Sequence, residues 1–107
     1  MIFEEDFMLN GKVSSTELPT GSGKGYRAYF CNNCGVYLYC KYAVATGRLA
    51  IRTATLDNPI TPQAYIFIKD KDPWIEISNK EICYDNMYDR DKVWPEDSLK
   101  RLKEKTK

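Results

Sequence analysis

The chain has 107 residues, the length of one domain, and a domain of this size buries roughly two thirds of the surface that its unfolded chain exposes. The hydrophobic share of 43% and the charged share of 29% are those of a globular protein, and eight tyrosines within an aromatic share of 13% favour strands over helices. Sixteen basic and fifteen acidic side chains leave a net charge of +1, which excludes the strongly positive surface that nucleic-acid binding uses. We therefore expect one domain over residues 1–107 and no nucleic-acid partner.

The runs of short, alternating apolar residues predict six antiparallel strands. In chain order they cover residues 7–13, 25–30, 36–42, 48–56, 64–69 and 74–77. Glycine, proline, asparagine and aspartate lie between them, where chain reversals need these residues. The stretch GSGKG at residues 21–25 departs from a phosphate-binding loop and favours a flexible turn instead.

The tail of the chain predicts a short helix. Pro95 suits a first turn, Glu96 and Asp97 suit the positive helix start, and basic residues follow. Residues 103–107 are expected to fray. The prediction is therefore a mainly β fold with a short C-terminal helix.

Two absences narrow the chemistry and the location. The sequence has no histidine, which excludes Ser-His-Asp and Cys-His catalysis and any imidazole metal ligand. No apolar run approaches ~18 residues, and Glu4, Glu5 and Asp6 stand where a secretory signal has cations. We expect a cytoplasmic protein with no membrane partner. In that reducing compartment, neighbouring cysteines are more often ligands or catalysts than disulfides.

The stretch FCNNCG, residues 30–35, predicts a zinc knuckle. In C-x-x-C-G between two strands, the turn directs both sulfurs toward one point, roughly 2.3 Å from a zinc ion, and the glycine accepts a backbone conformation that a Cβ atom would resist. Cys31 and Cys34 are therefore the candidate metal ligands and zinc the candidate cofactor. A redox couple is the second interpretation, although such couples usually begin a helix. Two small buried residues in a hairpin are the third.

A structural zinc site needs four ligands, so two more must come from elsewhere. Cys40 is six residues beyond Cys34, and strand alternation favours a buried position for it. Cys83 could return from the far end of the chain. A second chain could instead supply its own pair in a symmetric homodimer, or a different partner chain could complete the site. The sequence leaves these alternatives open.

Several longer stretches carry a family resemblance. They are SGKGYRAYFCNNCGVYLY, LAIRTATLDNP, QAYIFIKDKDPW and ICYD, in that order from about Phe7 to Tyr84. Together they resemble the second part of the glutathione-dependent formaldehyde-activating enzyme family, which also includes centromere protein V. The resemblance implies a β-tent of coiled antiparallel strands and a structural zinc site of which Cys31 and Cys34 are half. It also implies carbon–sulfur lyase chemistry on glutathione or its formaldehyde adduct.

The sequence departs from the family at its beginning. The family's N-terminal segment carries a C-x-C pair that completes the zinc site and a C-x-C-x-x-C group associated with catalysis, and these 107 residues contain neither. We therefore expect a formaldehyde-activating-enzyme-like domain without that segment, incomplete or inactive alone. The alternative is a non-catalytic, zinc-stabilised β module that acts as a binding or dimerisation subunit. No catalytic residue is assigned, since no thiol outside the knuckle has evidence of activation.

Overall fold

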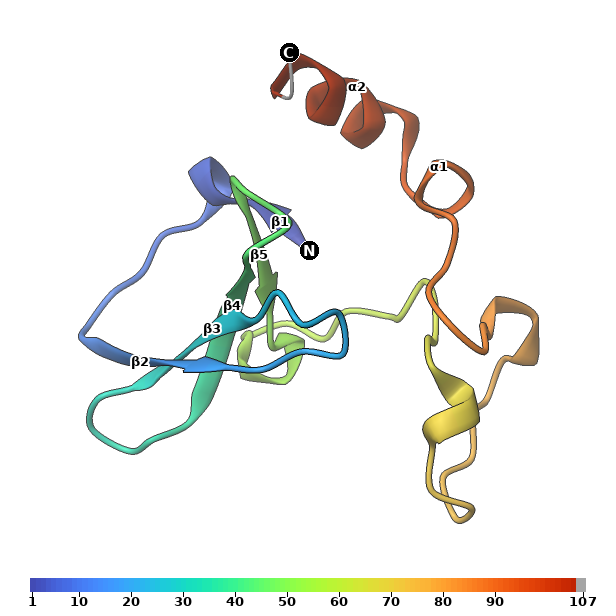
Figure 1. The fold of residues 1–107 in the computed structure, drawn as a ribbon, viewed down its shortest axis with the longest axis horizontal. Helices are drawn as coiled ribbons and strands as arrows, with labels where there is room; N and C mark the ends of the chain where they lie inside the picture. The colour runs from blue at the N-terminus through green and yellow to red at the C-terminus, as the bar shows by residue number, and fades with distance from the viewer. Residues whose placement is uncertain (106–107) are drawn as a thin grey trace. The chain divides into compact units, whose positions relative to one another are not determined.

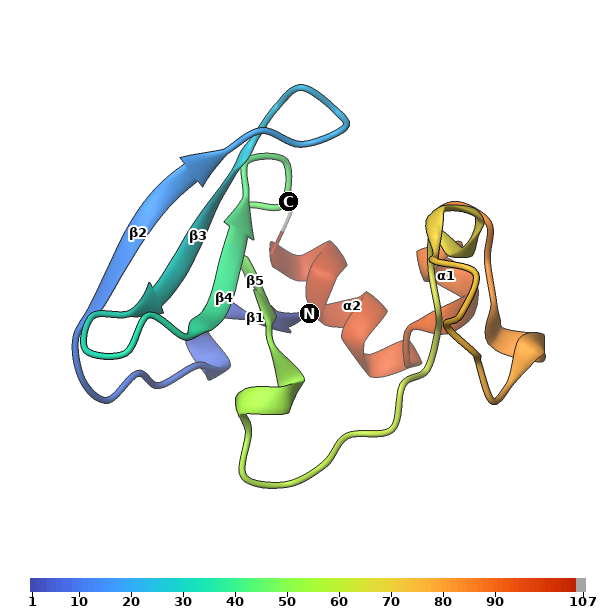
Figure 2. The same ribbon diagram turned by 90° about the horizontal axis from the view of Figure 1, so that it is seen from below.

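A computed structural model describes residues 1–105. The chain forms two compact units, residues 1–60 and residues 61–107, and each is described by itself. The ribbon is drawn in two orientations in Figures 1 and 2.

The first unit is built on one antiparallel sheet. Its strands are β1 (Ile2–Phe3), β2 (Val13–Leu18), β3 (Tyr26–Cys31), β4 (Tyr37–Tyr42) and β5 (Arg48–Ile51). Their order across the sheet is β1-β5-β4-β3-β2, and every pair is antiparallel. Figure 1 shows β2, β3 and β4 as successive hairpin strands, with β1 returning to the far edge beside β5. The mainly β prediction is confirmed.

The β3–β4 hairpin contains an irregularity that changes which side chains share a face. Tyr29 pairs with Tyr39, but the next residue, Phe30, pairs with Tyr37, so β4 carries one extra residue at Leu38. Such a bulge leaves the extra residue unpaired and bends the strand. The prediction that side chains alternate between the two faces without interruption from residue 36 to residue 42 is therefore wrong.

The buried apolar residues of this unit come from β1, β3, β4 and β5 and from the turn between β4 and β5. Its buried members are Phe3, Ala28, Tyr39, Cys40, Ala45 and Leu49. Ala28 and Cys40 are directly opposite each other in the β3–β4 pair, and Cys40 is also opposite Ala50 of β5. Small side chains at these positions allow the three strands to pack closely, which confirms the expectation that Cys40 is buried.

Two of the strands predicted in this unit differ from the structure. The strand predicted over residues 7–13 is wrong except at its last residue: β2 runs from Val13 to Leu18, and the chain before it turns at Gly11, whose φ of +98° is one that glycine adopts without strain. The strand predicted over 48–56 ends at Ile51, since a 3₁₀ turn follows at Thr53–Thr55. In that turn, the Thr55 amide and hydroxyl both donate to the Arg52 carbonyl, at 3.0 and 2.6 Å.

The second unit has little regular strand. The segments around Tyr65 and Cys83 meet in one parallel bridge, in which the Tyr65 amide donates to the Ile82 carbonyl and the Tyr84 amide to the Tyr65 carbonyl, at 2.9 and 2.8 Å. Short 3₁₀ turns lie at Ile68–Asp70 and Lys80–Ile82.

The strands predicted over residues 64–69 and 74–77 are wrong. Phe67 has a left-handed φ of 52°, which ends the extended run and begins the turn at Ile68. In the second stretch, the Ile75 amide donates to the Asp72 carbonyl at 3.0 Å across Pro73 and Trp74. A proline at the second position of a turn is pre-set for that geometry. Turn formation therefore replaces strand pairing in both places.

The second unit ends in two helices, α1 (Arg90–Val93) and α2 (Glu96–Lys105). Asp89 caps α1 by accepting the Asp91 amide at 3.0 Å. The C-terminal helix begins directly after Pro95, which confirms that prediction. It extends through residues 103–105, which were expected to fray, and residues 106–107 lie outside the described part of the chain.

No helix within residues 1–105 is both long enough and apolar enough to cross a membrane. The single-domain organisation over residues 1–107 stays a prediction, and so do the zinc knuckle and the tent-like coiling of the sheet.

Candidate functional site

The C-x-x-C sequence forms a tight turn at the end of β3. The Gly35 amide donates to the Cys31 carbonyl at 2.9 Å, and the Cys31 amide donates to the Val36 carbonyl at 2.8 Å. Gly35 has a φ of +77°, so a residue with a Cβ atom would be strained there. The predicted role of this glycine in closing the turn is confirmed.

A neighbouring loop holds the turn from outside. The Asn32 amide donates to the Lys12 carbonyl at 3.1 Å, and the Ser14 hydroxyl donates to the Asn32 side-chain carbonyl at 2.7 Å. The turn is therefore tied by hydrogen bonds to β2 and to the residue before it.

The two thiols of the turn lie together, in a setting that favours a thiolate. The backbone amides of Cys34 and Asn33 lower the pKa of Cys31 by donating hydrogen bonds to its sulfur, and the Cys34 thiol does so as well. Hydrogen bonds to the charged form favour ionisation. Cys34 itself is exposed, whereas Cys31 is half-buried. The two thiols are therefore neighbours in the turn, one half-buried and one exposed.

The other two cysteines have different surroundings. Cys40 is buried in the centre of the sheet, with 3% of its surface exposed. Its thiol lies near two tyrosines: burial is the main cause of a raised pKa at Tyr37 and at Tyr42, and Cys40 adds to both. In the second unit, the Cys83 thiol donates to the Asn79 carbonyl at 3.4 Å.

A structural zinc ion is held by four ligands. Within residues 1–105, no group of three or more cysteine, aspartate or glutamate side chains is placed to hold one metal ion. The Cys31–Cys34 turn therefore fits half of a tetrahedral thiolate site.

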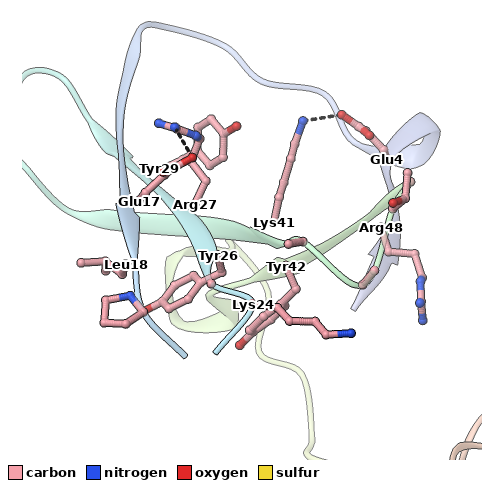
Figure 3. Close-up of a pocket in the computed structure, with 16 residues that line it drawn as sticks. Glu4, Glu17, Leu18, Lys24, Tyr26, Arg27, Tyr29, Lys41, Tyr42 and Arg48 are labelled. Atoms are coloured by element: carbon pink, nitrogen blue, oxygen red, sulfur yellow. Dashed lines mark hydrogen bonds and ion pairs between the residues drawn. The ribbon is translucent and has the colours of Figure 1, made fainter. Parts of the chain in front are cut away.

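A pocket of about 650 Å³ lies at the opposite end of the β3–β4 hairpin. Its walls come from the β2–β3 turn, the adjoining ends of β2, β3 and β4, and the turn from Ala43 to Gly47 between β4 and β5 (Figure 3). The turn GSGKG therefore forms part of a pocket wall, through Lys24 and Gly25. Gly25 is anchored there, because its amide donates to the Thr20 hydroxyl at 3.0 Å.

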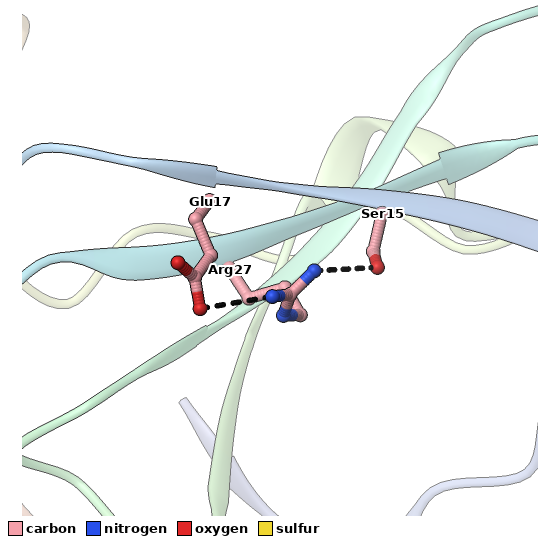
Figure 4. A network of polar contacts seen from close by, with 3 residues as sticks. All are labelled: Ser15, Glu17 and Arg27. Atoms are coloured by element: carbon pink, nitrogen blue, oxygen red, sulfur yellow. Dashed lines mark hydrogen bonds and ion pairs between the residues drawn. The ribbon is translucent and has the colours of Figure 1, made fainter.

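Charged side chains line the pocket, with cations in excess. They are Lys24, Arg27, Lys41, Arg48, Glu4 and Glu17, which is four cations against two carboxylates. Arg27 donates to Glu17 at 2.9 Å and to the Ser15 hydroxyl at 3.0 Å, as Figure 4 shows. Lys41 donates to Glu4, and this hydrogen bond is the main reason why the pKa of Lys41 is raised. By this count the residues that line the pocket carry an excess of positive charge.

Aromatic rings add flat apolar surface to the same pocket. The rings of Tyr26 and Tyr42 lie 5.4 Å apart between centroids, and both line it together with Leu18. Lys24 lies near them in Figure 3, and its ammonium group pairs with no carboxylate among the residues described. A lining of aromatic faces with a few charged groups is typical of sites for small polar molecules.

Sequence reasoning did not identify this pocket. One feature of the sequence could have indicated it. Two cations, Arg27 and Lys41, are directly opposite each other across β3 and β4. Glu4 and Glu17, which pair with them, come from separate parts of the chain.

The fold and these two features define a small antiparallel β protein with a paired-thiol turn at one end of a hairpin and a cationic pocket at the other. Residues 1–70 match the family model described as Glutathione-dependent formaldehyde-activating enzyme. The chain therefore belongs to this family, which confirms the resemblance. The match ends before the Pro73-Trp74 pair and Cys83. No curated protein and no solved structure matched the chain.

Proposed function

We propose that this protein acts in glutathione-dependent formaldehyde handling: it binds glutathione or its formaldehyde adduct in the cationic pocket and binds zinc at Cys31 and Cys34. The observation that carries the proposal is the excess of cations around an open pocket in a chain that belongs to this family. We place the protein in the cytoplasm, where free thiols stay reduced.

The pocket matches the charges of glutathione. The tripeptide has two carboxylates, one ammonium group and a thiol, and its adduct adds only a hydroxymethyl group on sulfur. The cations that line the pocket, Lys24 among them, would attract the carboxylates, and Glu4 would accept from the ammonium group. The rings of Tyr26 and Tyr42 would contact the peptide and methylene groups. A volume of about 650 Å³ is within the usual range for small-molecule sites.

The zinc has a structural role in this proposal. Bound by thiolates, it would cross-link the segment at β3 to further ligands and so add to the stability of the fold. The amides of Asn33 and Cys34, which donate to the Cys31 sulfur, would offset the negative charge of the thiolates. The family resemblance also implies a tent-like coiling of the sheet, which we include in the proposal.

The reaction itself is an addition to a carbonyl group. The glutathione sulfur bonds to the formaldehyde carbon, the carbonyl electron pair moves to oxygen, and the proton of the thiol ends on that oxygen. The reverse step is the lyase direction. The pocket residues would hold the tripeptide and screen its carboxylates, while the catalytic residues stay unassigned. The alternative is a non-catalytic, zinc-stabilised β module that binds the same ligand as a subunit of an assembly.

Calorimetric titration with glutathione and with S-methylglutathione tests the pocket. Both ligands should bind with similar affinity, because the charged groups that the pocket recognises are the same, and added salt should weaken both. The absence of heat and of chemical-shift changes at the pocket residues would rule out this function.

Exchange NMR on mixtures of glutathione and formaldehyde then separates the two candidate functions. Faster exchange than in buffer supports the lyase. Binding without acceleration supports the module.

A further inference from the structure

We propose that the cationic pocket also accepts conjugates of glutathione whose sulfur carries an aromatic group, and that three side chains, Leu18, Tyr26 and Tyr42, hold this group. These three residues are called the apolar row. The inference deepens the proposed function and rests on it, because it takes glutathione binding as given and adds a second class of ligand.

The apolar row follows from the strand register. Leu18 of β2 is opposite Tyr26 of β3, and Tyr26 is opposite Tyr42 of β4. The three side chains therefore share one face of the sheet, and all of them line the pocket. The rings of Tyr26 and Tyr42 are tilted by 33° to each other. Two such rings beside a leucine form a surface that suits a flat apolar group.

The apolar row is open to solvent. Leu18 is 39% exposed and Tyr42 is 37% exposed. Exposed apolar side chains that occur singly are normal, but several together in the wall of a pocket are typical of a ligand-binding surface. Glutathione itself contains no ring, and its apolar parts are methylene groups. A ligand with an additional aromatic group would cover more of this surface.

Charge and apolar surface are separated within the pocket lining. Glu17, Arg27 and Lys41 each precede or follow a member of the apolar row along the same three strands. Since successive side chains of a strand point to opposite faces, these charged groups lie on the other face. There Arg27 pairs with Glu17, and Lys41 pairs with Glu4. A glutathione conjugate has the same division, with a polar tripeptide and a separate apolar group.

The turn between β2 and β3 places a cation beside the apolar row. Lys24 lies near Tyr26 and Tyr42 in Figure 3, and it pairs with no carboxylate among the residues described. The turn is held in place, because the Gly25 amide donates to the Thr20 hydroxyl at 3.0 Å. A carboxylate of the tripeptide bound at Lys24 would bring the rest of the ligand to the apolar row.

The glutathione sulfur is the position that can carry the aromatic group. The proposed function already requires space at this sulfur, because the formaldehyde adduct has a hydroxymethyl group there. Replacing the hydroxymethyl group by an aromatic one leaves both carboxylates and the ammonium group unchanged. The ligand class is therefore the thioethers of glutathione that have an aromatic substituent.

Calorimetric titration of the 107-residue chain with S-benzylglutathione and with S-methylglutathione tests the proposal. S-benzylglutathione should bind about tenfold more tightly, as expected when one aromatic group is covered by two rings. Its heat-capacity change on binding should be more negative, since more apolar surface is buried. Added salt should weaken both ligands and leave the ratio of their affinities unchanged, because their charges are identical.

Two variants test where the benzyl group lies. Tyr42→Ala and Leu18→Ala should each lower the affinity ratio to about threefold or less. Leu18 ends the edge strand β2 and is exposed, so Leu18→Ala should fold even if Tyr42→Ala does not. Val44→Ala is the matched control, because Val44 is 60% exposed and lies outside the pocket lining. The control should keep the ratio of the wild type.

Equal affinities of the two ligands for the wild type would overturn the inference and leave the proposed function standing, since S-methylglutathione would still bind. A tenfold ratio that survives both Tyr42→Ala and Leu18→Ala would place the benzyl group elsewhere and would also overturn it. The absence of binding by either ligand would contradict the inference and the proposed function together.

Discussion

The ring of Tyr29 on β3 stacks against that of Tyr39 on β4, with centroids 4.5 Å apart and planes within 7° of parallel. Phe7, from the segment before β2, packs on the same Tyr39 ring at 4.8 Å. Tyr39 is 6% exposed. These contacts join the centre of the sheet to the segment that precedes β2.

Tyr39→Ala should therefore lower the free energy of unfolding substantially. Removing a large buried aromatic side chain typically costs about 3 kcal/mol, and Tyr39 carries both ring contacts. Urea denaturation followed by tyrosine fluorescence measures the change. Tyr42→Ala is the control, since Tyr42 is 37% exposed and should cost about 1 kcal/mol. Equal losses in the two variants would contradict this assignment of the core.

Gly35→Ala should weaken both the fold and metal binding. A residue with a Cβ atom at a φ of +77° is strained by about 1 kcal/mol, so the turn that carries Cys31 and Cys34 would shift. Thermal unfolding and zinc titration measure the two effects. Gly21→Ala is the matched control, because Gly21 has no positive φ and open space around it; its stability should change by no more than about 0.5 kcal/mol. Unchanged zinc affinity in Gly35→Ala would show that the turn tolerates the alanine.

The protein should lose stability at alkaline pH because of its tyrosines. Burial raises the pKa of Tyr37, Tyr39 and Tyr42 above the ordinary value of 10.0, and Cys40 contributes at Tyr37 and Tyr42. A group whose folded pKa is raised stabilises the fold fully below its unfolded pKa, and this contribution disappears as the pH rises through the folded pKa. The free energy of unfolding should therefore fall once the pH exceeds about 10.

Tyr37→Phe should remove part of that fall, because phenylalanine has no proton to lose. Absorbance titration of phenolate, run beside denaturation at each pH, measures both quantities. If the free energy of unfolding changed with pH in the same way in the wild type and in the variant, up to the end of the titration, Tyr37 would have no role in this loss of stability.

Lys24→Ala should reduce glutathione affinity by about threefold to fivefold, the value of one exposed charge interaction. Lys24 lines the pocket and forms no ion pair with a carboxylate among the residues described, so its charge is available to the ligand. Calorimetry measures the affinity, and Lys12→Ala, outside the pocket lining, controls for net charge. Identical losses in both variants would mean that only overall charge matters.

Glu17→Gln should have the opposite effect on the same measurement. The side chains of Arg27 and Glu17 are 40% and 78% exposed, so their ion pair adds little stability, less than about 1 kcal/mol. Losing the carboxylate frees the guanidinium for a ligand carboxylate, and affinity should rise about twofold. A fall in affinity would instead place the ligand's ammonium group at Glu17.

The sequence by itself determined those features of the fold that depend on residues close together in the chain. The turn at residues 31–35 and the helix after Pro95 follow from glycine and proline at particular positions, and the mainly β character follows from tyrosine-rich alternating runs. Cys31 and Cys34 lie three residues apart, so their proximity needs no long-range information.

Tertiary structure alone decided how the strands meet and where the pocket lies. The polar stretch Val13–Leu18 is a strand because β3 supplies its hydrogen-bond partners, and Ile2–Phe3 is one because β5 does. The pocket brings Glu4, Glu17, Lys24 and Lys41 together through the antiparallel order of β1 to β5. Strand pairing depends on contacts between residues that are far apart in the sequence. A local sequence pattern carries no information about the energies of those contacts. The turn chemistry could therefore be predicted, whereas the cationic pocket could not.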